Sequence, residues 1–194
     1  MNQTEARQRL ERVVADTMTA AIARDEWDLP PDLVLWFAHE DGIEHLSMPA
    51  FQMIVQMVEG QIAEVPRVAA ILVRKAAEDG VVLFERVRGE AFLAGIMYLH
   101  EGYGFMGEAL ENNLDEINAY LDRGGKIADH PLGVETRNIT VVGPGSYAYA
   151  AVHVRGTAEP VLLGTGETAV ADGHVIDGMR DLRNAINEQL RAGG

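Results

Sequence analysis

The stretch that decides the fold runs from Phe92 to Arg155 and reads FLAGIMYLHEGYGFMGEALENNLDEINAYLDRGGKIADHPLGVETRNITVVGPGSYAYAAVHVR. It opens with an unbroken apolar run over residues 92–99. A short apolar run followed by glycines favours a strand covered on both faces over a helix. His100 and Glu101 come next, at the expected end of the strand, where Gly102 and Gly104 would let the chain turn sharply.

A helix is expected over residues 106–122, because apolar residues recur there at helical spacing. The expected buried stripe consists of Met106, Leu110, Leu114, Ile117 and Leu121. Acidic residues occupy the other face: Glu108, Glu111, Asp115, Glu116 and Asp122. The sequence leaves open whether this acidic face meets water or another chain.

Two further strands are expected over residues 139–142 and 147–154, joined by the glycine-containing turn 143–146. Side chains alternate between the two faces of a strand. One face of the second strand carries Ala148, Ala150, Val152 and Val154, and the other carries Tyr147, Tyr149, His153 and Arg155. The tyrosine-bearing face is expected to be half solvated or to line a cleft, unless helices cover it.

The remaining chain alternates between helical and extended patterns. Helices are expected over residues 4–24, from Ser47–Pro49 onward, from Pro66 to Gly80 and over 175–191. Strands are expected over residues 33–38, 43–48, 81–87 and 161–163, with the glycine-containing segment 164–168 read as an ordinary loop. These elements predict a single α+β domain over residues 1–194, with an antiparallel or mixed sheet of about five or six strands packed by about five helices.

A tight hairpin is expected where the first two of these strands meet. Asp41-Gly42 is a favoured two-residue turn. That turn would place His39 opposite Glu44, as a cross-strand pair.

Composition limits the classes of function. The chain of 194 residues has a formal net charge of −14 and contains no cysteine. Its charge opposes direct binding to nucleic acids and anionic membranes, and the absence of cysteine excludes disulfides and thiolate metal sites and fits a cytoplasmic protein. No apolar run reaches the roughly 18 residues that a bilayer span requires, so a soluble protein is expected.

The segment His130-Pro131, followed by Val134-Glu135-Thr136-Arg137 before a strand, resembles segments of uncharacterised small acidic proteins of actinobacteria and their phages. The bias toward arginine over lysine fits such a source, since it is typical of GC-rich coding sequences. The resemblance implies no activity, no cofactor and no site residue.

Two His-Glu pairs are the best chemical lead in the sequence. His39-Glu40 and His100-Glu101 each follow an apolar run and precede a glycine. Imidazoles with a carboxylate suit zinc or non-haem iron, although neither pair has the spacing that places two ligands on one face of a helix. These four residues are therefore the catalytic candidates, while no metal and no cofactor is expected.

The leading interpretation is a non-enzymatic protein-binding module that forms a homodimer. It would act through its acidic surface and the tyrosine-bearing sheet face, with Tyr147, Tyr149, His153 and Arg155 as contact residues. A metal- or small-molecule-dependent enzyme built on the His-Glu pairs is the first alternative. The second is an acidic mimic of nucleic acid that blocks a basic partner.

Overall fold

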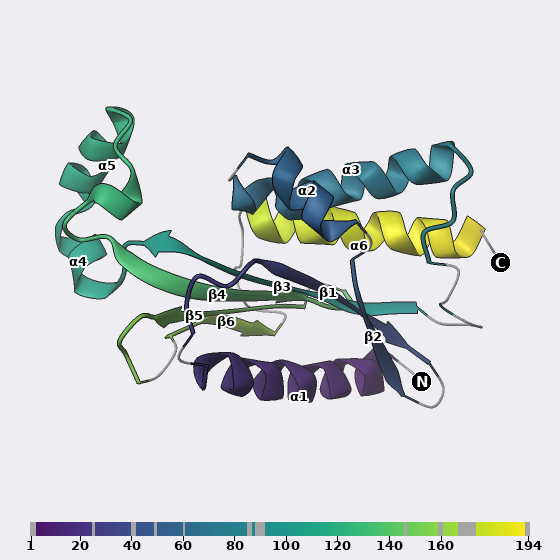
Figure 1. The fold of residues 1–194 in the computed structure, drawn as a ribbon. Helices are drawn as coiled ribbons and strands as arrows, with labels where there is room; N and C mark the ends of the chain where they lie inside the picture. Colours follow the sequence, from purple (N-terminus) through teal and green to yellow (C-terminus); the bar gives the residue numbers. More distant parts are fainter. Residues whose placement is uncertain are drawn as a thin grey trace.

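The computed structural model shows an antiparallel sheet with helices on both faces (Figure 1). It describes residues 3–24, 26–39, 42–48, 50–59, 61–84, 87, 92–145, 147–158, 161–166 and 174–192. In the described part of the chain, six strands form one sheet in the order β2-β1-β3-β4-β5-β6. The expected α+β class is confirmed.

The elements follow one another along the chain with few long connections. The helices are α1 (Gln3–Ile22), α2 (Phe51–Met57), α3 (Val65–Glu78), α4 (Gly107–Asn112), α5 (Leu114–Asp122) and α6 (His174–Ala192), with two short 3-10 turns, η1 (Ile62–Glu64) and η2 (Ile127–Asp129). The strands are β1 (Asp32–Ala38), β2 (Ile43–Ser47), β3 (Phe92–Gly104), β4 (Val134–Val142), β5 (Ala148–Val154) and β6 (Val161–Gly166).

The sheet separates two hydrophobic cores. On one face α2, α3 and α6 cover the larger core, which contains Phe37, Ile96, Tyr98 and Val142 from the sheet. Of the helices that the structure describes, α1 is the one that lies on the other face of the sheet (Figure 1). It contributes Val14 and Ala21 to a smaller core with sheet residues that include Trp36, Met97, Ile139, Val141 and Tyr147. A strand between two such layers must be apolar on both faces, which explains the continuous run that opens β3.

The helical layer depends on a close approach between α3 and α6. A Cβ atom added at Gly178 of α6 would lie 2.9 Å from the backbone nitrogen of Arg67 and 3.3 Å from Cβ of Pro66. Glycine therefore lets the two helices pack backbone to backbone, around buried residues of α3 such as Ala69 and Ala70.

The predicted turn after Leu99 is wrong, because β3 continues as a strand to Gly104. Residues 96–104 pair with β4 in one unbroken antiparallel register, from Ile96 opposite Val142 to Gly104 opposite Val134. The partner strand supplies hydrogen bonds that local sequence does not reveal, so the glycines are accommodated without a turn. His100 and Glu101 thus lie inside a long strand.

The single helix predicted over residues 106–122 is two helices that meet at Asn113. Asn113 has φ −127° and ψ 22°, and its side-chain amide donates a 2.9 Å hydrogen bond to the carbonyl oxygen of Ala109. A side-chain bond of this kind competes with the helical backbone. Within α5 the expected buried stripe is also wrong, since only Ile117 is buried.

Four smaller expectations need correction. Hydrogen bonds join His39 N–H to the Gly42 carbonyl and Phe37 pairs with Glu44, so the hairpin register differs by two residues from the predicted one. Ser47 lies in β2 and does not cap α2, whose N-cap is Ala50. The described residues between 81 and 87 form no strand, and residues 164–166 extend the edge strand β6.

Candidate functional site

The structure does not bring the two His-Glu pairs together. β1 and β3 are antiparallel neighbours, and Asp32 at the start of β1 pairs with Leu99. His39 follows the end of β1, so it lies at the opposite end of the sheet from His100 (Figure 1). His39 instead contacts Glu44, with 3.2 Å between Nε2 and Oε2, because a two-residue shift in register keeps both side chains on the same face. Glu40 lies outside the described residues.

Glu101 is bound to a buried arginine that sequence reasoning missed. Arg137 of β4 pairs with Glu101 across the sheet, and its side chain is only 1% exposed. Its Nη2 lies 2.7 Å from Oε1 of Glu101, and its Nε donates to the same oxygen at 2.9 Å. The other carboxylate oxygen accepts a hydrogen bond from the backbone N–H of Leu29 at 3.0 Å. Three N–H groups from two residues therefore fix this carboxylate, and it is occupied by structural contacts.

The same guanidinium binds the chain that leaves α1. Arg137 Nη1 donates to the carbonyl oxygen of Ala21, and Nη2 donates to that of Glu26. The ring of Trp27 lies 4.7 Å from the guanidinium carbon, within the range of a cation–π contact. The last carbonyls of a helix lack intrahelical donors, and a cation is favourable at that end of the helix dipole. Arg137 thus anchors the C-terminus of α1 to the centre of the sheet.

The tyrosine-bearing face of β5 is the face that α1 covers. Tyr147 is buried in the smaller core, and Tyr149 packs against it. His153 is buried beneath Trp27, with 5.8 Å between ring centroids. Arg155 Nη1 lies 2.5 Å from Oε2 of Glu135, and its guanidinium carbon lies 5.4 Å from the centroid of the Trp27 ring. The alternation of side chains is as predicted, and the face is largely interior, with Tyr147 and His153 buried and only Arg155 exposed among the four residues.

His100 projects from the opposite face of β3, beside Tyr98, with 5.0 Å between ring centroids. Burial lowers the pKa of His100, and a weaker hydrogen bond involving the Glu101 backbone acts against this. Burial also raises the pKa of the Tyr98 phenol, whose hydroxyl donates a 2.9 Å hydrogen bond to the Ile62 carbonyl. The Tyr98 hydroxyl thus contacts η1 and the His100 ring packs against that of Tyr98, which favours a packing role for both side chains.

Among the residues that the structure describes, no three histidine, aspartate or glutamate side chains gather as a metal site. The best candidate for a functional surface is instead a projecting segment, residues 105–133, which we call the arm. The arm contains α4, α5 and η2 and is carried by the ends of β3 and β4, away from the helical layer (Figure 1). His130 holds it together internally, with its ring 5.1 Å from that of Phe105 and 4.7 Å from that of Tyr120.

The outward face of α5 combines apolar and acidic groups. Leu114 and Leu121 are seven residues apart, so they share one helical face, and they are 51% and 37% exposed. Asp115 and Asp122 follow them directly along the chain and are also exposed. We call these four residues the α5 surface. The sequence showed the leucine stripe and the acids, but the stripe was expected to face a core that this helix does not reach.

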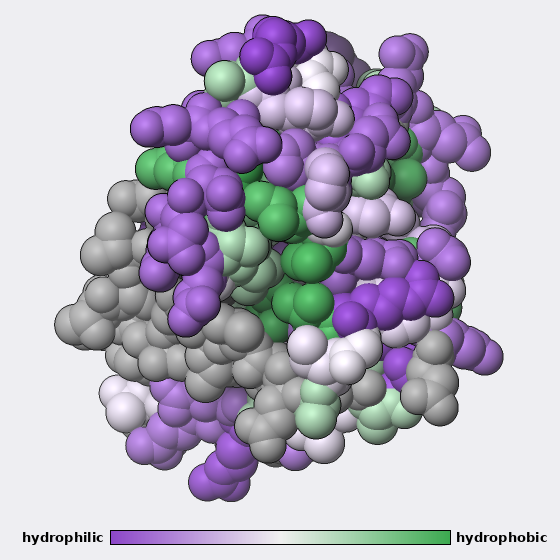
Figure 2. Space-filling model, turned by 90° about the vertical axis from the view of Figure 1, so that its left-hand side faces the viewer, coloured by the Kyte–Doolittle hydropathy of each residue, from purple (hydrophilic) through white to green (hydrophobic). Residues whose placement is uncertain are grey.

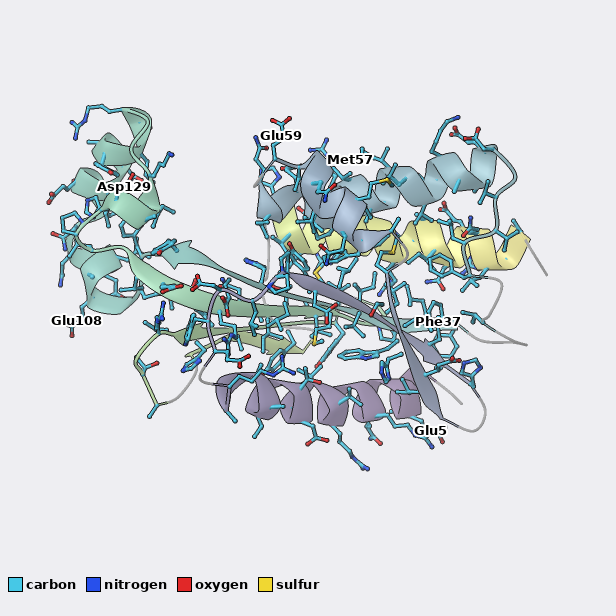
Figure 3. All side chains as sticks on the ribbon, in the orientation of Figure 1. Glu5, Phe37, Met57, Glu59, Glu108 and Asp129 are labelled. Carbon is cyan, nitrogen blue, oxygen red and sulfur yellow. The ribbon has the colours of Figure 1, made fainter. Side chains whose placement is uncertain are left out.

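Glu108 and Asp129 both extend from the arm, far from the sheet cores (Figure 3). Viewed from the end that carries the arm, the described part of the surface shows apolar side chains among hydrophilic ones (Figure 2). Arrangements with an apolar centre and a polar rim are typical of protein interfaces.

Comparison with known proteins adds no relative: no protein-family model, no curated protein and no solved structure matches the chain. None of the helices in the described ranges is long and apolar enough to cross a membrane.

Proposed function

We propose that the protein is a non-enzymatic binding module that docks a basic protein segment on the α5 surface. The observation that carries the proposal is the exposure of Leu114 and Leu121 beside unpaired acids on a projecting arm. A helix normally buries such a stripe, and large exposed apolar groups with a polar rim mark interaction sites.

Charge determines the chemistry of the proposed partner. The exposed acids of the arm are Glu108, Glu111, Asp115, Glu116, Asp122 and Asp129. None of them forms an ion pair within the part of the chain that the structure describes. Asp122 also lies at the C-terminal end of α5, where the helix dipole disfavours an anion. A segment with Lys or Arg beside an apolar side chain would complement both features, and the electrostatic part would speed its association.

Self-association is a separate proposal. Two copies that met through the α5 surface would place acids against acids, so a homodimer would have to form elsewhere on the molecule.

The cytoplasm is the proposed compartment, in keeping with a sequence that has no cysteine.

The proposal is tested by selection from a random peptide library on the immobilised full-length protein, followed by measurement of binding by the selected peptides. We expect enrichment of peptides that combine Lys or Arg with Leu or Phe. The variant Leu114→Gln/Leu121→Gln keeps every charge and should weaken binding at least tenfold, about 1.4 kcal/mol. The control variant Asp16→Asn/Glu59→Gln, which changes exposed acids outside the arm, should bind as the wild type does.

Equal binding by the leucine variant and the wild type would contradict the proposal, because general attraction to an acidic protein would then explain the result. The mimic of nucleic acid makes a different prediction. A mimic would compete with duplex DNA for a DNA-binding protein, and neutralisation of the arm acids would abolish that competition while the leucine variant retained it.

A further inference from the structure

A cavity lies along the last turns of α6, on the helical layer and apart from the α5 surface. It has a volume of about 330 Å³ and lies between α6, the start of β3 and the β4–β5 turn. Its walls are formed by Phe92, Leu93, Pro144, Gly145, Arg183, Asn184, Asn187, Glu188 and Arg191. We propose that this cavity binds a small organic carboxylate, with Arg183 and Arg191 on the charged group and Phe92 and Pro144 against its apolar body.

The two arginines carry the proposal because no carboxylate of the described residues pairs with them. Acidic residues outnumber basic ones by 30 to 16. Most described basic side chains of the helical layer form ion pairs, such as Arg74 with Asp181 at 3.7 Å. Within the described residues, neither Arg183 nor Arg191 has a carboxylate within 4.0 Å, and Arg183 makes only a 3.4 Å hydrogen bond to the carbonyl oxygen of Gly145.

Burial also leaves the charge of Arg183 poorly compensated. Desolvation lowers the pKa of Arg183, and the positive charge of nearby Arg180 lowers it further. An anion in the cavity would offset both effects, since an opposite charge favours the ionised guanidinium.

Amide groups next to the arginines supply further donors. Asn187 accepts the Leu93 N–H through Oδ1 at 3.3 Å, which leaves its Nδ2 to donate elsewhere. Arg183, Asn187 and Arg191 recur at four-residue spacing, so they lie along one side of α6. Guanidinium and amide N–H groups in one row fit a planar carboxylate, which guanidinium can bind in bidentate fashion.

The remaining wall residues narrow the class of ligand. Glu188 brings one negative charge beside the two guanidinium groups, so the cavity offers a single net positive charge to its ligand. A monoanion satisfies that charge, whereas a phosphate dianion would be held against a neighbouring carboxylate. Phe92 and Pro144 add apolar wall, and a volume near 330 Å³ lies at the lower end of ordinary ligand pockets.

The test is a titration of the full-length protein with phenylacetate, acetate and inorganic phosphate, followed by NMR and by thermal unfolding at constant ionic strength. Phenylacetate should bind saturably, shift the resonances of Asn184 and Asn187, and raise the melting temperature, because a ligand of the folded state stabilises it. Acetate should bind more weakly because it lacks an apolar body. Phosphate that bound more tightly than phenylacetate would overturn the assignment to carboxylates.

The variant Arg183→Gln/Arg191→Gln should reduce affinity for phenylacetate at least tenfold. Its control is Arg67→Gln/Arg74→Gln, which removes the same charge from α3, outside the cavity, and should bind as the wild type does. Arg183→Lys/Arg191→Lys keeps the charge but loses the planar guanidinium that binds a carboxylate in bidentate fashion. Its affinity for phenylacetate should lie between that of the wild type and that of Arg183→Gln/Arg191→Gln. Folding of each variant is verified by circular dichroism without ligand. Absence of saturable binding in the wild type, or equal binding in both glutamine variants, would refute the site.

Discussion

At the scale of single residues, Arg137 connects segments that lie more than a hundred residues apart in the chain. Its guanidinium binds Glu101 on β3, the carbonyl group of Ala21 in the last turn of α1 and that of Glu26 after the helix. A buried ion pair is a weak source of stability by itself. Its importance here is that loss of Arg137 leaves the Glu101 carboxylate without its counter-ion and the carbonyls of Ala21 and Glu26 without this donor.

We therefore expect Arg137→Met to lower the free energy of unfolding by roughly 3–5 kcal/mol, a large share of the 5–15 kcal/mol typical of a domain. Urea denaturation measures this loss. Glu101→Leu added to Arg137→Met should recover part of it, because the second change removes the uncompensated buried carboxylate. A single variant within 1 kcal/mol of the wild type would show that solvent reaches this cluster.

At the scale of elements, the contact between α3 and α6 depends on one missing side chain. Alanine is a better helix former than glycine by about 1 kcal/mol, so Gly178→Ala would stabilise an exposed helix. Here the new Cβ would lie 2.9 Å from the backbone nitrogen of Arg67, which cannot move without shifting α3.

Gly178→Ala should accordingly be destabilising, and Gly178→Val more so, with overpacking costs of about 1–3 kcal/mol. Thermal and urea unfolding of the two variants would measure this series. A stabilised alanine variant would mean that helix propensity outweighs the steric contact and that the helices separate easily.

In the arm, the local sequence predicts a buried helix, whereas the structure leaves Leu114 and Leu121 exposed. Its leucine pattern is that of a core helix, yet the strands that carry it extend beyond the other helices (Figure 1). We propose that an external partner covers this stripe, which is the basis of the proposed function.

At the scale of the whole molecule, charge is the dominant property. A net charge of −14 on 194 residues produces self-repulsion in the compact state. Added salt screens that repulsion, since the Debye length falls to about 10 Å at 0.1 M ionic strength.

The melting temperature should therefore rise by a few degrees between about 0.02 M and about 0.2 M NaCl. Scanning calorimetry or circular dichroism would measure the rise. The matched variant Asp115→Asn/Glu116→Gln/Asp122→Asn should show a smaller rise, because it removes part of the repulsion within the arm. A melting temperature independent of salt would indicate that local ion pairs already balance the acids.

The sequence by itself determined the local elements. The alternation along β5, the apolar run that opens β3 and the periodicity of α6 each depend on neighbouring residues, so they predict strands and helices correctly. The acidic composition is likewise a property of the chain alone.

Only the tertiary structure decided which surfaces are free. Arg137 meets Ala21 across more than a hundred residues of chain, and α1 covers the tyrosine-bearing face of β5. The α5 surface remains exposed because β3 and β4 hold it beyond the cores. The physical reason is that periodicity shows which side of an element is apolar, whereas the path of the chain determines what that side meets.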